Sequence, residues 1–440
     1  MPDVQQEATA LLQRLVRHVT VNPPGDERPL QEELAALLAG AGFEVTLLGR
    51  TEPRPNLVAR LRGRADGPTL CLLSHVDTVL AHAEEWQRDP WSGAVVDGEL
   101  WGRGAIDMKS QTAAEVVAAV SLAREGWRPA AGDLLVVVVV DEEVGGTDGA
   151  IWLTEHHPDA VRCDELLNEG AGSVIPLDGA PVYGVCVAEK GVFRFTVTTE
   201  GTAGHASMPA ISDNALLKMA PVLEAMKAGR AGFDVTEGPR LLLRGLGIGL
   251  EESDDGARAA LAALAERDPR LAVLVEPMLG VTLAPTRISA SEKINVIPSR
   301  AALKVDCRTP PGMGREEVLA RIHQVLDGAG VDGWRVTFDE EVVGNGSPAD
   351  TRLMDAIRGW VAREVPEATV VPYMLPAFTD SRTFRAAFPD CVAYGFFPHR
   401  HMTVYETSAL LHAKDERIDV RDLGFATRFF RDIVQERLGA

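Results

Sequence analysis

The sequence is poor in cysteine, and the few thiols it has are scattered. Five cysteines occur in 440 residues, none of them in CxxC spacing. An odd, dispersed set argues against a disulfide framework, which needs paired cysteines, and against a CxxC-type metal site. Cys71 and Cys307 lie within strand-like patterns and are expected to be buried reduced thiols. This cysteine usage predicts a cytoplasmic protein.

Basic residues and long apolar runs are also scarce. Lys and Arg number 44 against 64 Asp and Glu, which gives a formal net charge of −20. Because nucleic-acid binding needs a basic surface, this balance predicts no nucleic-acid partner. No apolar run approaches the roughly 20 residues of a transmembrane helix. The first 30 residues lack the pattern of a signal peptide, so we expect no membrane partner.

The chain does contain short apolar runs that end in histidine or acidic residues. The first of them, residues 69–73, predicts a buried strand that brings His75 and Asp77 to its C-terminal end. In open α/β sheets, ligands bind at that end of the strands. Further acids follow later apolar runs or lie in glycine-rich turns: Asp107, Glu142, Glu143 and Glu169.

One histidine with several carboxylates at strand ends suits a two-zinc hydrolytic site. His75 could offer a neutral imidazole nitrogen to a metal, while Asp77 could hold the other ring N–H. Taken singly, the acids allow simpler roles, since Asp107 could cap the following helix and Glu169 could be a turn residue. The glycines adjoining them in GRGAID, EEVGG and NEGAG favour a site, because backbone can approach a ligand closely there.

Two patterns follow each other along the chain. Up to residue 187, helical segments alternate with apolar strands, which predicts an α/β fold with a mostly parallel mixed sheet and helices on both faces. The later segments VFRFTVTTEG and RAALKVDCR alternate apolar and polar residues, which is typical of an antiparallel sheet. We therefore expect one α/β domain, 1–187 and 309–440, interrupted by a smaller α+β domain, 188–308.

Seven short motifs are spread over nearly the whole chain: SHVDTV, GRGAIDMKSQ, VVVDEEVGG, NEG, GTAGHASMP, INVIPSRAALKVDCR and LLHAKDERI. In this order they resemble the M20 family of zinc metallopeptidases and amidohydrolases. The resemblance implies that 1–187 and 309–440 form the catalytic domain and 188–308 a lid or dimerisation domain. That family includes carboxypeptidases, aminoacylases and the acetylornithine and succinyl-diaminopimelate deacylases. YGFFP followed by HAKDERI is most similar to the branch of Gly-X carboxypeptidases and N-acyl-amino-acid hydrolases.

The resemblance implies a site for two Zn²⁺ ions per subunit, with Co²⁺ as an alternative ion. Asp107 would bridge both ions. His75 and Glu169 would complete the first position. Glu143 and His412 would complete the second. Each ion would then have three protein ligands, which leaves coordination positions open for chemistry.

The resemblance also selects one of three histidines that lie close together late in the chain. The family's histidine precedes an acidic pair and a strand-like run, and HAKDERIDV matches this pattern at His412. His399 and His401 are expected in an exposed loop. Their position near YGFFP leaves contact with substrate open.

Three further residues around the metals receive roles from the resemblance. Glu142 would be the general base, and Asp77 would orient His75. His205 would stabilise the oxyanion that develops on the scissile carbonyl. In dimeric relatives this histidine enters the neighbouring subunit's site, so a homodimer is expected.

Two groups of residues resemble substrate contacts of the family. Asn295 and Arg308 would bind the substrate's oxyanion or carboxylate, for which a guanidinium is a natural fork. Their separation of 13 residues (308 − 295) suits a strand–turn–strand unit that returns both to one edge. Thr379, Asp380 and Ser381 in AFTDSRTF resemble a loop of the substrate pocket.

The predicted function is hydrolysis of an amide or peptide bond beside a free carboxylate, in an N-acyl amino acid or short peptide. An inactive relative kept as a scaffold is the rival from another class, and an acetylornithine- or succinyl-diaminopimelate-type deacylase is the rival within the enzymes. A nucleotide enzyme is disfavoured because no GxGxxG or GxxxxGK[ST] motif opens a helix.

An acidic, Ala-rich stretch near 231–285 could enlarge the lid or block a lid-to-lid dimer.

Overall fold

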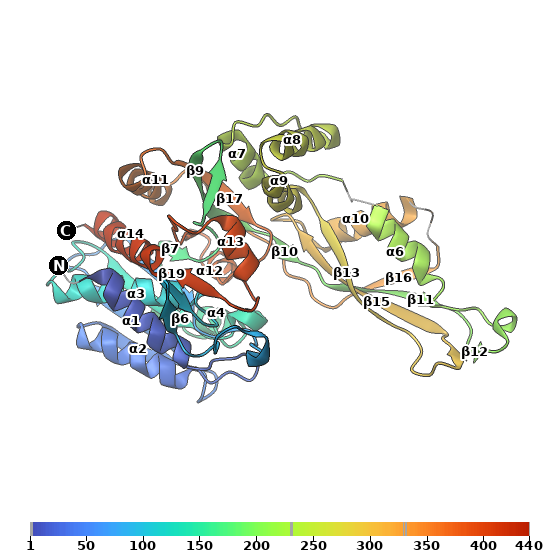
Figure 1. Ribbon diagram of the computed structural model, residues 1–440, viewed down its shortest axis with the longest axis horizontal. Coiled ribbons are helices and arrows are strands. Elements are labelled where there is room, and N and C mark those ends of the chain that lie inside the picture. The colour runs from blue at the N-terminus through green and yellow to red at the C-terminus, as the bar shows by residue number, and fades with distance from the viewer. Residues whose placement is uncertain (1–2, 229–231, 329, 331, 440) are drawn as a thin grey trace. The chain divides into compact units, whose positions relative to one another are not determined.

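The computed structural model describes residues 3–228, 232–328, 330 and 332–439. The chain divides into two compact units, drawn in Figure 1. Unit 1 comprises Met1–Val187, Gly346–Tyr373 and Thr379–Ala440, and unit 2 comprises Ala188–Asn345 and Met374–Phe378. None of the described helices is both long and apolar enough to cross a membrane.

A nine-stranded mixed sheet forms the middle of unit 1. Its strand order is β1 (Glu44–Leu48), β2 (Asn56–Arg62), β6 (Asp133–Val139), β3 (Leu70–His75), β7 (Glu165–Asn168), β18 (Val392–Gly395), β9 (Ala180–Glu189) and β17 (Thr369–Leu375), with β8 (Val174–Leu177) paired to β9. The four central strands β6, β3, β7 and β18 are parallel. Antiparallel pairs flank them on both sides. The expected α/β fold is confirmed.

Helices cover both faces of this sheet. On one face α3 packs against β3 and β6 and against its neighbours α1, α2 and α14. The bounds are α1 (Val4–Arg17), α2 (Arg28–Gly40), α3 (Lys109–Arg124) and α14 (Val420–Leu438). All residues of α3 from Lys109 to Ala123 are buried, which explains why this Ala- and Val-rich helix lacks a polar face.

The opposite face is covered by two short helices, α4 (Ala150–His156) and α12 (Ser381–Ala387). Leu153 and Phe384 from these helices pack with Cys71 and Leu73 of β3 in one buried cluster. The remaining elements of unit 1 are η1 (Ala83–Glu85), β4 (Ala94–Val96), β5 (Glu99–Trp101), η2 (Glu142–Val144), α5 (Pro158–Val161), α11 (Arg352–Glu364), α13 (Val404–Leu410) and β19 (Arg417–Asp419).

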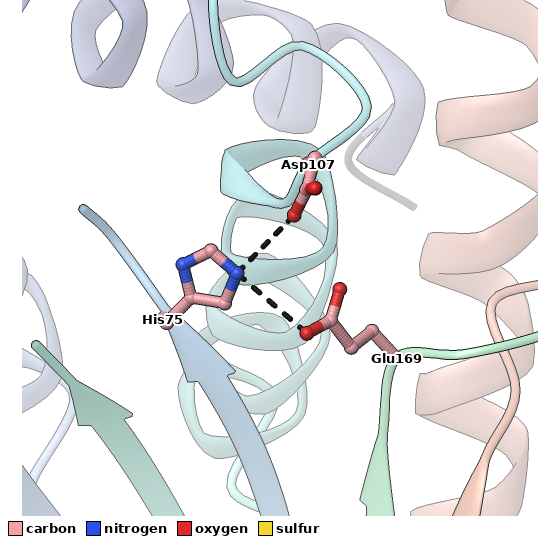
Figure 2. A group of neighbouring side chains, drawn as sticks. All are labelled: His75, Asp107 and Glu169. Atoms are coloured by element: carbon pink, nitrogen blue, oxygen red, sulfur yellow. Dashed lines mark hydrogen bonds and ion pairs between the residues drawn. The ribbon is translucent and has the colours of Figure 1, made fainter. Parts of the chain in front are cut away.

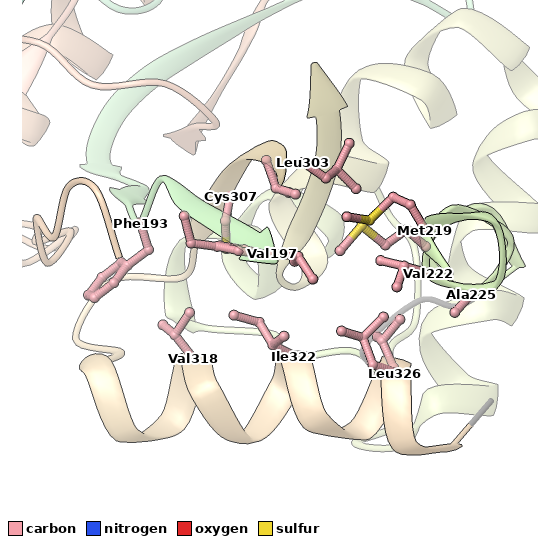
Figure 3. Packing of buried hydrophobic residues seen from close by; sticks show 14 of the residues in the cluster. Phe193, Val197, Met219, Val222, Ala225, Leu303, Cys307, Val318, Ile322 and Leu326 are labelled. Carbon is pink, nitrogen blue, oxygen red and sulfur yellow. The ribbon is translucent and has the colours of Figure 1, made fainter. Parts of the chain in front are cut away.

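Unit 2 is built on an antiparallel sheet with two helices on one face. Its order is β10 (Gly191–Val192), β15 (Arg300–Thr309), β11 (Phe195–Glu200) and β16 (Trp334–Phe338), and β13 (Thr282–Ser289) also pairs with β15. In Figure 3, Val318, Ile322 and Leu326 of α10 (Arg315–Gly328) point toward Val197 and Leu303 of the sheet. Met219 and Val222 of α6 (Met219–Ala228) complete the same core.

The compact units differ from the sequence-based boundary at residue 308. Helix α10 and strand β16 were expected in the second part of the catalytic domain, but both lie in unit 2. The physical reason is long-range pairing, because β16 lies beside β11 with Val197 opposite Val336. The sequence of a helix and a following strand does not show which sheet the strand joins.

The acidic stretch near 231–285 is mainly helical. Residue 231 lies outside the described residues. The stretch contains α7 (Glu237–Gly245), α8 (Asp254–Arg267), α9 (Pro269–Val275) and η4 (Glu276–Leu279), and β13 begins at its end. The buried Lys190 Nζ donates to the carbonyls of Pro277 (2.8 Å) and Gly280 (2.7 Å), so the end of the insertion is tied to the start of unit 2.

Candidate metal centre

Three parallel strands bring the candidate ligands to one edge of the sheet in unit 1. Strand β3 ends at His75, β6 ends just before Glu142 and Glu143, and β7 ends just before Glu169. Because these strands run in the same direction, their C-terminal ends meet at that edge. Asp107 lies in the turn just before the buried helix α3 and reaches the same place.

The first group consists of His75, Asp107 and Glu169, whose side chains point toward one another in Figure 2. His75 Nε2 lies 3.2 Å from Asp107 Oδ1 and 3.6 Å from Glu169 Oε1. The imidazole is buried at the end of β3. One nitrogen and two carboxylate oxygens therefore face a common point.

The second group consists of Asp107, Glu143 and His412. His412 Nε2 lies 3.1 Å from Asp107 Oδ2 and 3.1 Å from Glu143 Oε2. His412 belongs to the loop between α13 and β19, and 55% of its side chain is exposed. Asp107 thus offers one oxygen to each group and joins the two.

The donor atoms suit divalent metal ions. Within each group the ligand atoms lie within 4.8 Å of one another. Imidazole nitrogens and carboxylate oxygens are the ligands that hydrolytic zinc sites use. Without cations the acids crowd each other: burial raises the pKa of Glu169 well above its usual range, and the Asp107 carboxylate adds to this.

The two imidazoles compensate part of this crowding. Burial would raise the pKa of Asp107, but hydrogen bonds from His412 and His75 outweigh it and hold that pKa well below its usual range. The hydrogen bonds to Asp107 and Glu143 raise the pKa of His412 to about 10. A set of acids that draws both histidines toward the charged form is one in which metal cations would be favoured.

Glu142 lies beside these groups but belongs to neither of them. Its Oε2 is 3.9 Å from His75 Nε2. Burial raises the pKa of Glu142 well above its usual range, and the carboxylates of Glu169 and Asp380 add to the shift. A carboxylate with a raised pKa at the rim of a metal site is suited to accept and return a proton.

Asp77 connects His75 to the turn that holds the two glutamates. His75 Nδ1 lies 3.1 Å from the backbone oxygen of Asp77 and 3.4 Å from its Oδ1. The same carboxylate accepts hydrogen bonds from the backbone N–H of Glu142 (3.2 Å) and Glu143 (3.2 Å). Asp77 therefore lies where an orienting residue was expected, and it also anchors the Glu142–Glu143 turn.

The sequence did not predict a buried polar network that lies behind Asp77. Asn22 Nδ2 donates to Asp77 (2.9 Å) and to Asp141 (3.1 Å). Arg54 donates to Asp141 (2.9 Å) and forms a two-bond ion pair with Glu27 (3.0 and 3.1 Å). Asp141 has a φ of 73°, a left-handed conformation that is unfavourable for most non-glycine residues. The network holds this strained residue directly before Glu142.

The loop of Thr379, Asp380 and Ser381 lies at the start of α12, beside the end of β7. Asn168, the last residue of β7, donates through Nδ2 to Thr379 Oγ1 (3.3 Å) and Ser381 Oγ (3.1 Å). Since Glu169 is the next residue after Asn168, this loop is positioned next to the first group.

The expectation for His399 is corrected by the structure. It is buried rather than exposed, and its Nδ1 lies 3.0 Å from Ser173 Oγ. The reason is that the loop after β18 folds against the loop after β7, where the backbone N–H of His399 donates to Gly172 O (3.0 Å). His401 is exposed, as expected.

Unit 2 holds the other three predicted site residues. His205 lies on β12 (Gly204–His205), which pairs with β14 (Val296–Ile297), and Asn295 O accepts a hydrogen bond from Ala206 N (3.1 Å). His205 and Asn295 are therefore neighbours. Arg308 lies near the end of β15, where its Nε donates to Asp306 (2.6 Å).

Arg308 and Asn295 do not return to one edge. Asn295 precedes the start of β15 at Arg300, whereas Arg308 lies near its end. At about 3.3 Å per residue, the strand between Arg300 and Arg308 spans roughly 26 Å. The sequence spacing failed because β15 is one long strand, while the turn that precedes it is short. Among the described residues, no hydrogen-bond partner faces the buried Nη1 of Arg308.

Comparison with protein families gives one match that covers most of the chain. The model described as "Peptidase family M20/M25/M40" matches residues 71–436. Among curated proteins, a succinyl-diaminopimelate desuccinylase of Cereibacter sphaeroides is 32% identical over 229 residues. That match covers 50% of this chain and 57% of the desuccinylase, so the chain spans little more than half the length of that relative.

Two matches extend over more of the chain. A probable carboxypeptidase S-like 2 of Dictyostelium discoideum is 24% identical over 383 residues, which cover 83% of this chain and 71% of that protein. The crystal structure of an M20 family metallo-carboxypeptidase from Sulfolobus solfataricus superposes with a TM-score of 0.74 at 17% identity, covering 98% of both chains. At that identity the superposition establishes the shared fold.

Proposed function

The chain belongs to peptidase family M20/M25/M40, and we propose that it is a two-zinc hydrolase that cleaves an amide bond beside a free carboxylate. The observation that supports this most directly is the pair of ligand groups that share Asp107. Two Zn²⁺ ions, or Co²⁺ in their place, would be held by the first group, His75, Asp107 and Glu169, and by the second, Asp107, Glu143 and His412.

The protein's own residues would divide the remaining work. When bound, the metal ions would acidify water and polarise the scissile carbonyl. Glu142 would accept a proton from the attacking water and later pass it to the leaving nitrogen. Asp77 would keep His75 in the tautomer that leaves Nε2 available to the metal. His205 would donate to the oxyanion.

Substrates with a free carboxylate are supported by Arg308. Its guanidinium has a buried Nη1 without a partner among the described residues, and the Phe378 ring lies 5.7 Å from its Cζ. A planar guanidinium can donate two parallel hydrogen bonds to a carboxylate. Two similar proteins are named as carboxypeptidases, and we propose N-acyl amino acids or short peptides as substrates, with Asn295, Thr379, Asp380 and Ser381 as further contacts.

A desuccinylase is the second candidate, because the relative that is 32% identical over half of this chain is named so. Both candidates are hydrolases with the same metal chemistry, and they differ in the acyl group removed. An inactive scaffold is not favoured, since the ligand residues and Glu142 lie together in the geometry of a site. The burial of all five cysteines supports our proposal of a cytoplasmic location.

We also propose a homodimer in which His205 acts in the partner's site. One chain cannot bring both His205 and Arg308 to the same small substrate if they stay at opposite ends of β15. Large apolar side chains are exposed around the two-stranded sheet of β12 and β14, and such patches mark interaction surfaces. They are Met208, Ile211, Ile294 and Val296.

A combined metal and substrate assay tests the proposed activity. Purified protein should contain close to two zinc ions per chain and lose hydrolysis on chelation, with recovery on adding Zn²⁺ or Co²⁺. A panel of N-acetyl, long-chain N-acyl, N-succinyl and dipeptide substrates would separate the two candidates. One ion or fewer per chain, with activity that resists chelators, would contradict the proposal.

The dimer has a test of its own. Inactive His205→Ala and Glu142→Gln proteins are mixed under conditions in which subunits exchange. Each hybrid dimer contains one site with both wild-type groups, so partial activity should return. Absence of recovery despite demonstrated exchange would place His205 in the site of its own chain.

A further inference from the structure

A buried ion pair lies between the loops that carry two of the proposed ligands. Arg103 Nη1 donates to Glu416 Oε2 at 2.6 Å, and the exposed fractions of the two side chains are 3% and 0%. Removing charges from water is costly, so a pair this deeply buried needs further hydrogen bonds on both sides. Neither residue belongs to the two ligand groups.

Glu416 binds the loop that leads into Asp107. Its Oε1 accepts hydrogen bonds from the backbone N–H of Ile106 (2.7 Å) and of Asp107 itself (3.0 Å). Its Oε2 accepts a further one from Gly104 N (3.0 Å). Three backbone donors on one carboxylate fix the position of this loop, and with it the Asp107 side chain.

Arg103 binds the loop that carries His412. Its Nη2 lies 3.0 Å from the carbonyl oxygen of Ala413 and 3.4 Å from that of His412. A second anchor holds the same loop, since Gln87 donates through its backbone N–H (2.7 Å) and Nε2 (3.0 Å) to Asp415. The ion pair therefore joins the Asp107 loop to the His412 loop.

His412 needs such support more than His75 does. His75 ends a buried strand, whereas His412 has a φ of 56° on a loop and a half-exposed side chain. Backbone hydrogen bonds, rather than packing around the ring, decide where His412 lies. Without them its Nε2 would not stay 3.1 Å from Asp107 and Glu143.

We propose that Arg103 is a positioning residue that builds the second metal position, Asp107–Glu143–His412, and leaves the first position independent. Its partner Glu416 positions Asp107, which both positions share. This inference rests on the proposed two-metal function. Partners outside the ligand set typically change metal affinity 10- to 100-fold, and the change caused by altering Arg103 should fall on one of the two ions.

The test measures metal affinity by competition with a chelator, using Zn²⁺ and Co²⁺. Arg103→Lys keeps a positive charge near Glu416 but cannot reach the carbonyls of the His412 loop at the same time. We expect one ion to bind roughly 10- to 100-fold more weakly and the other to keep its wild-type affinity. The matched control is Arg437→Lys, which alters another Arg–Glu pair of unit 1, at 2.7 and 2.8 Å to Glu165, away from the ligand loops.

Two backgrounds identify which ion is affected. In His412→Ala, where the second position is already lost, Arg103→Lys should leave the affinity of the remaining ion unchanged. In His75→Ala it should weaken the remaining ion by the same factor as in the wild type. Equal weakening of both ions, or any further loss in His412→Ala, would overturn the inference.

Two further variants keep the inference testable if Arg103→Lys does not fold. Gln87→Ala removes the Nε2 hydrogen bond of the second anchor, keeps its backbone hydrogen bond, and should weaken the ion at the second position by roughly threefold to tenfold. Glu416→Gln should weaken both ions, because an amide cannot accept from all of the present donors and Asp107 belongs to both groups. If these variants leave metal affinity unchanged, the inference fails. If wild-type protein itself binds fewer than two ions, it is the proposed function that fails.

Discussion

The two proposed metal positions offer similar ligands on very different supports. His75 is the last residue of the buried strand β3, where it lies opposite Val139 of β6 in the sheet. His412 lies on a loop, 55% exposed, and is held by hydrogen bonds from the Arg103 side chain to the backbone carbonyls of the loop. The comparison teaches that the first position is prearranged by the fold, whereas the second depends on a few polar contacts. The first ion should therefore be the more tightly bound.

The largest effect should come from the residue that both positions share. Asp107→Ala removes one oxygen from each group, so both ions should be lost, and hydrolysis should fall by about 10³-fold or more. Metal analysis after dialysis checks this directly. Retention of one tightly bound ion would show that Asp107 does not bridge the two ions. The two positions would then share no ligand.

The same substitution at two adjacent residues should have different outcomes. Glu142→Gln should keep both ions and lower kcat by roughly 10²- to 10⁴-fold, the range for loss of a general base. Glu143→Gln should instead lose the second ion, since its Oε2 is 3.1 Å from His412 Nε2. Metal content and single-turnover rates measured together distinguish these results. Near-wild-type turnover in Glu142→Gln would move the proton transfer to another group.

Replacing each histidine tests the difference in support. His75→Ala removes a buried imidazole that separates three carboxylates, and we expect a loss of about 3 kcal/mol in the free energy of unfolding of the metal-free protein. His412→Ala should cost less, about 1 kcal/mol, because its ring is half-exposed and only its hydrogen bonds to Asp107 and Glu143 are lost. Each variant should lose one ion. Equal changes in the denaturant midpoint of the two variants would mean that the fold supports the two histidines equally.

The smallest effect on metal binding is expected behind the first position. Asn22→Ala leaves Asp77 and Asp141 without one donor each, at 2.9 and 3.1 Å, and should cost about 1–3 kcal/mol of stability. Metal stoichiometry should stay at two, with the first ion bound somewhat more weakly. Thermal unfolding with and without Zn²⁺ measures both quantities. Loss of an ion in this variant would show that Asn22 supports the ligands more directly than its contacts suggest.

The proposed ligands at strand ends could be predicted from the sequence for a simple physical reason. Parallel strands align their C-terminal ends, so residues that follow β3, β6 and β7 must meet whatever the intervening loops do. Glu143 and Glu169 were placed by this rule together with His75. His412 follows no strand, and only the resemblance to a family selected it among three late histidines.

The supporting residues could not be found in this way. Arg103 and Glu416 are 313 positions apart, and each lies in a charged motif that would suit an exposed loop equally well. The network of Asn22, Arg54 and Asp141 is also assembled from distant segments. The placement of β16 in unit 2 depends on pairing with β11, which no local pattern encodes. Local sequence patterns identified the candidate metal ligands. The residues that hold these ligands in place come together only in the tertiary structure.

The length of β15 fixes a distance within unit 2. The strand runs from Arg300 to Thr309, bonded to β11 and β13, with His205 and Asn295 beyond its start and Arg308 near its end. Removing one residue would turn every following side chain to the other face of the sheet. Removing two would preserve the faces and shorten the reach by roughly 7 Å, provided β11 and β13 shortened as well. The spacing between these residues can therefore change only in steps of one residue pair.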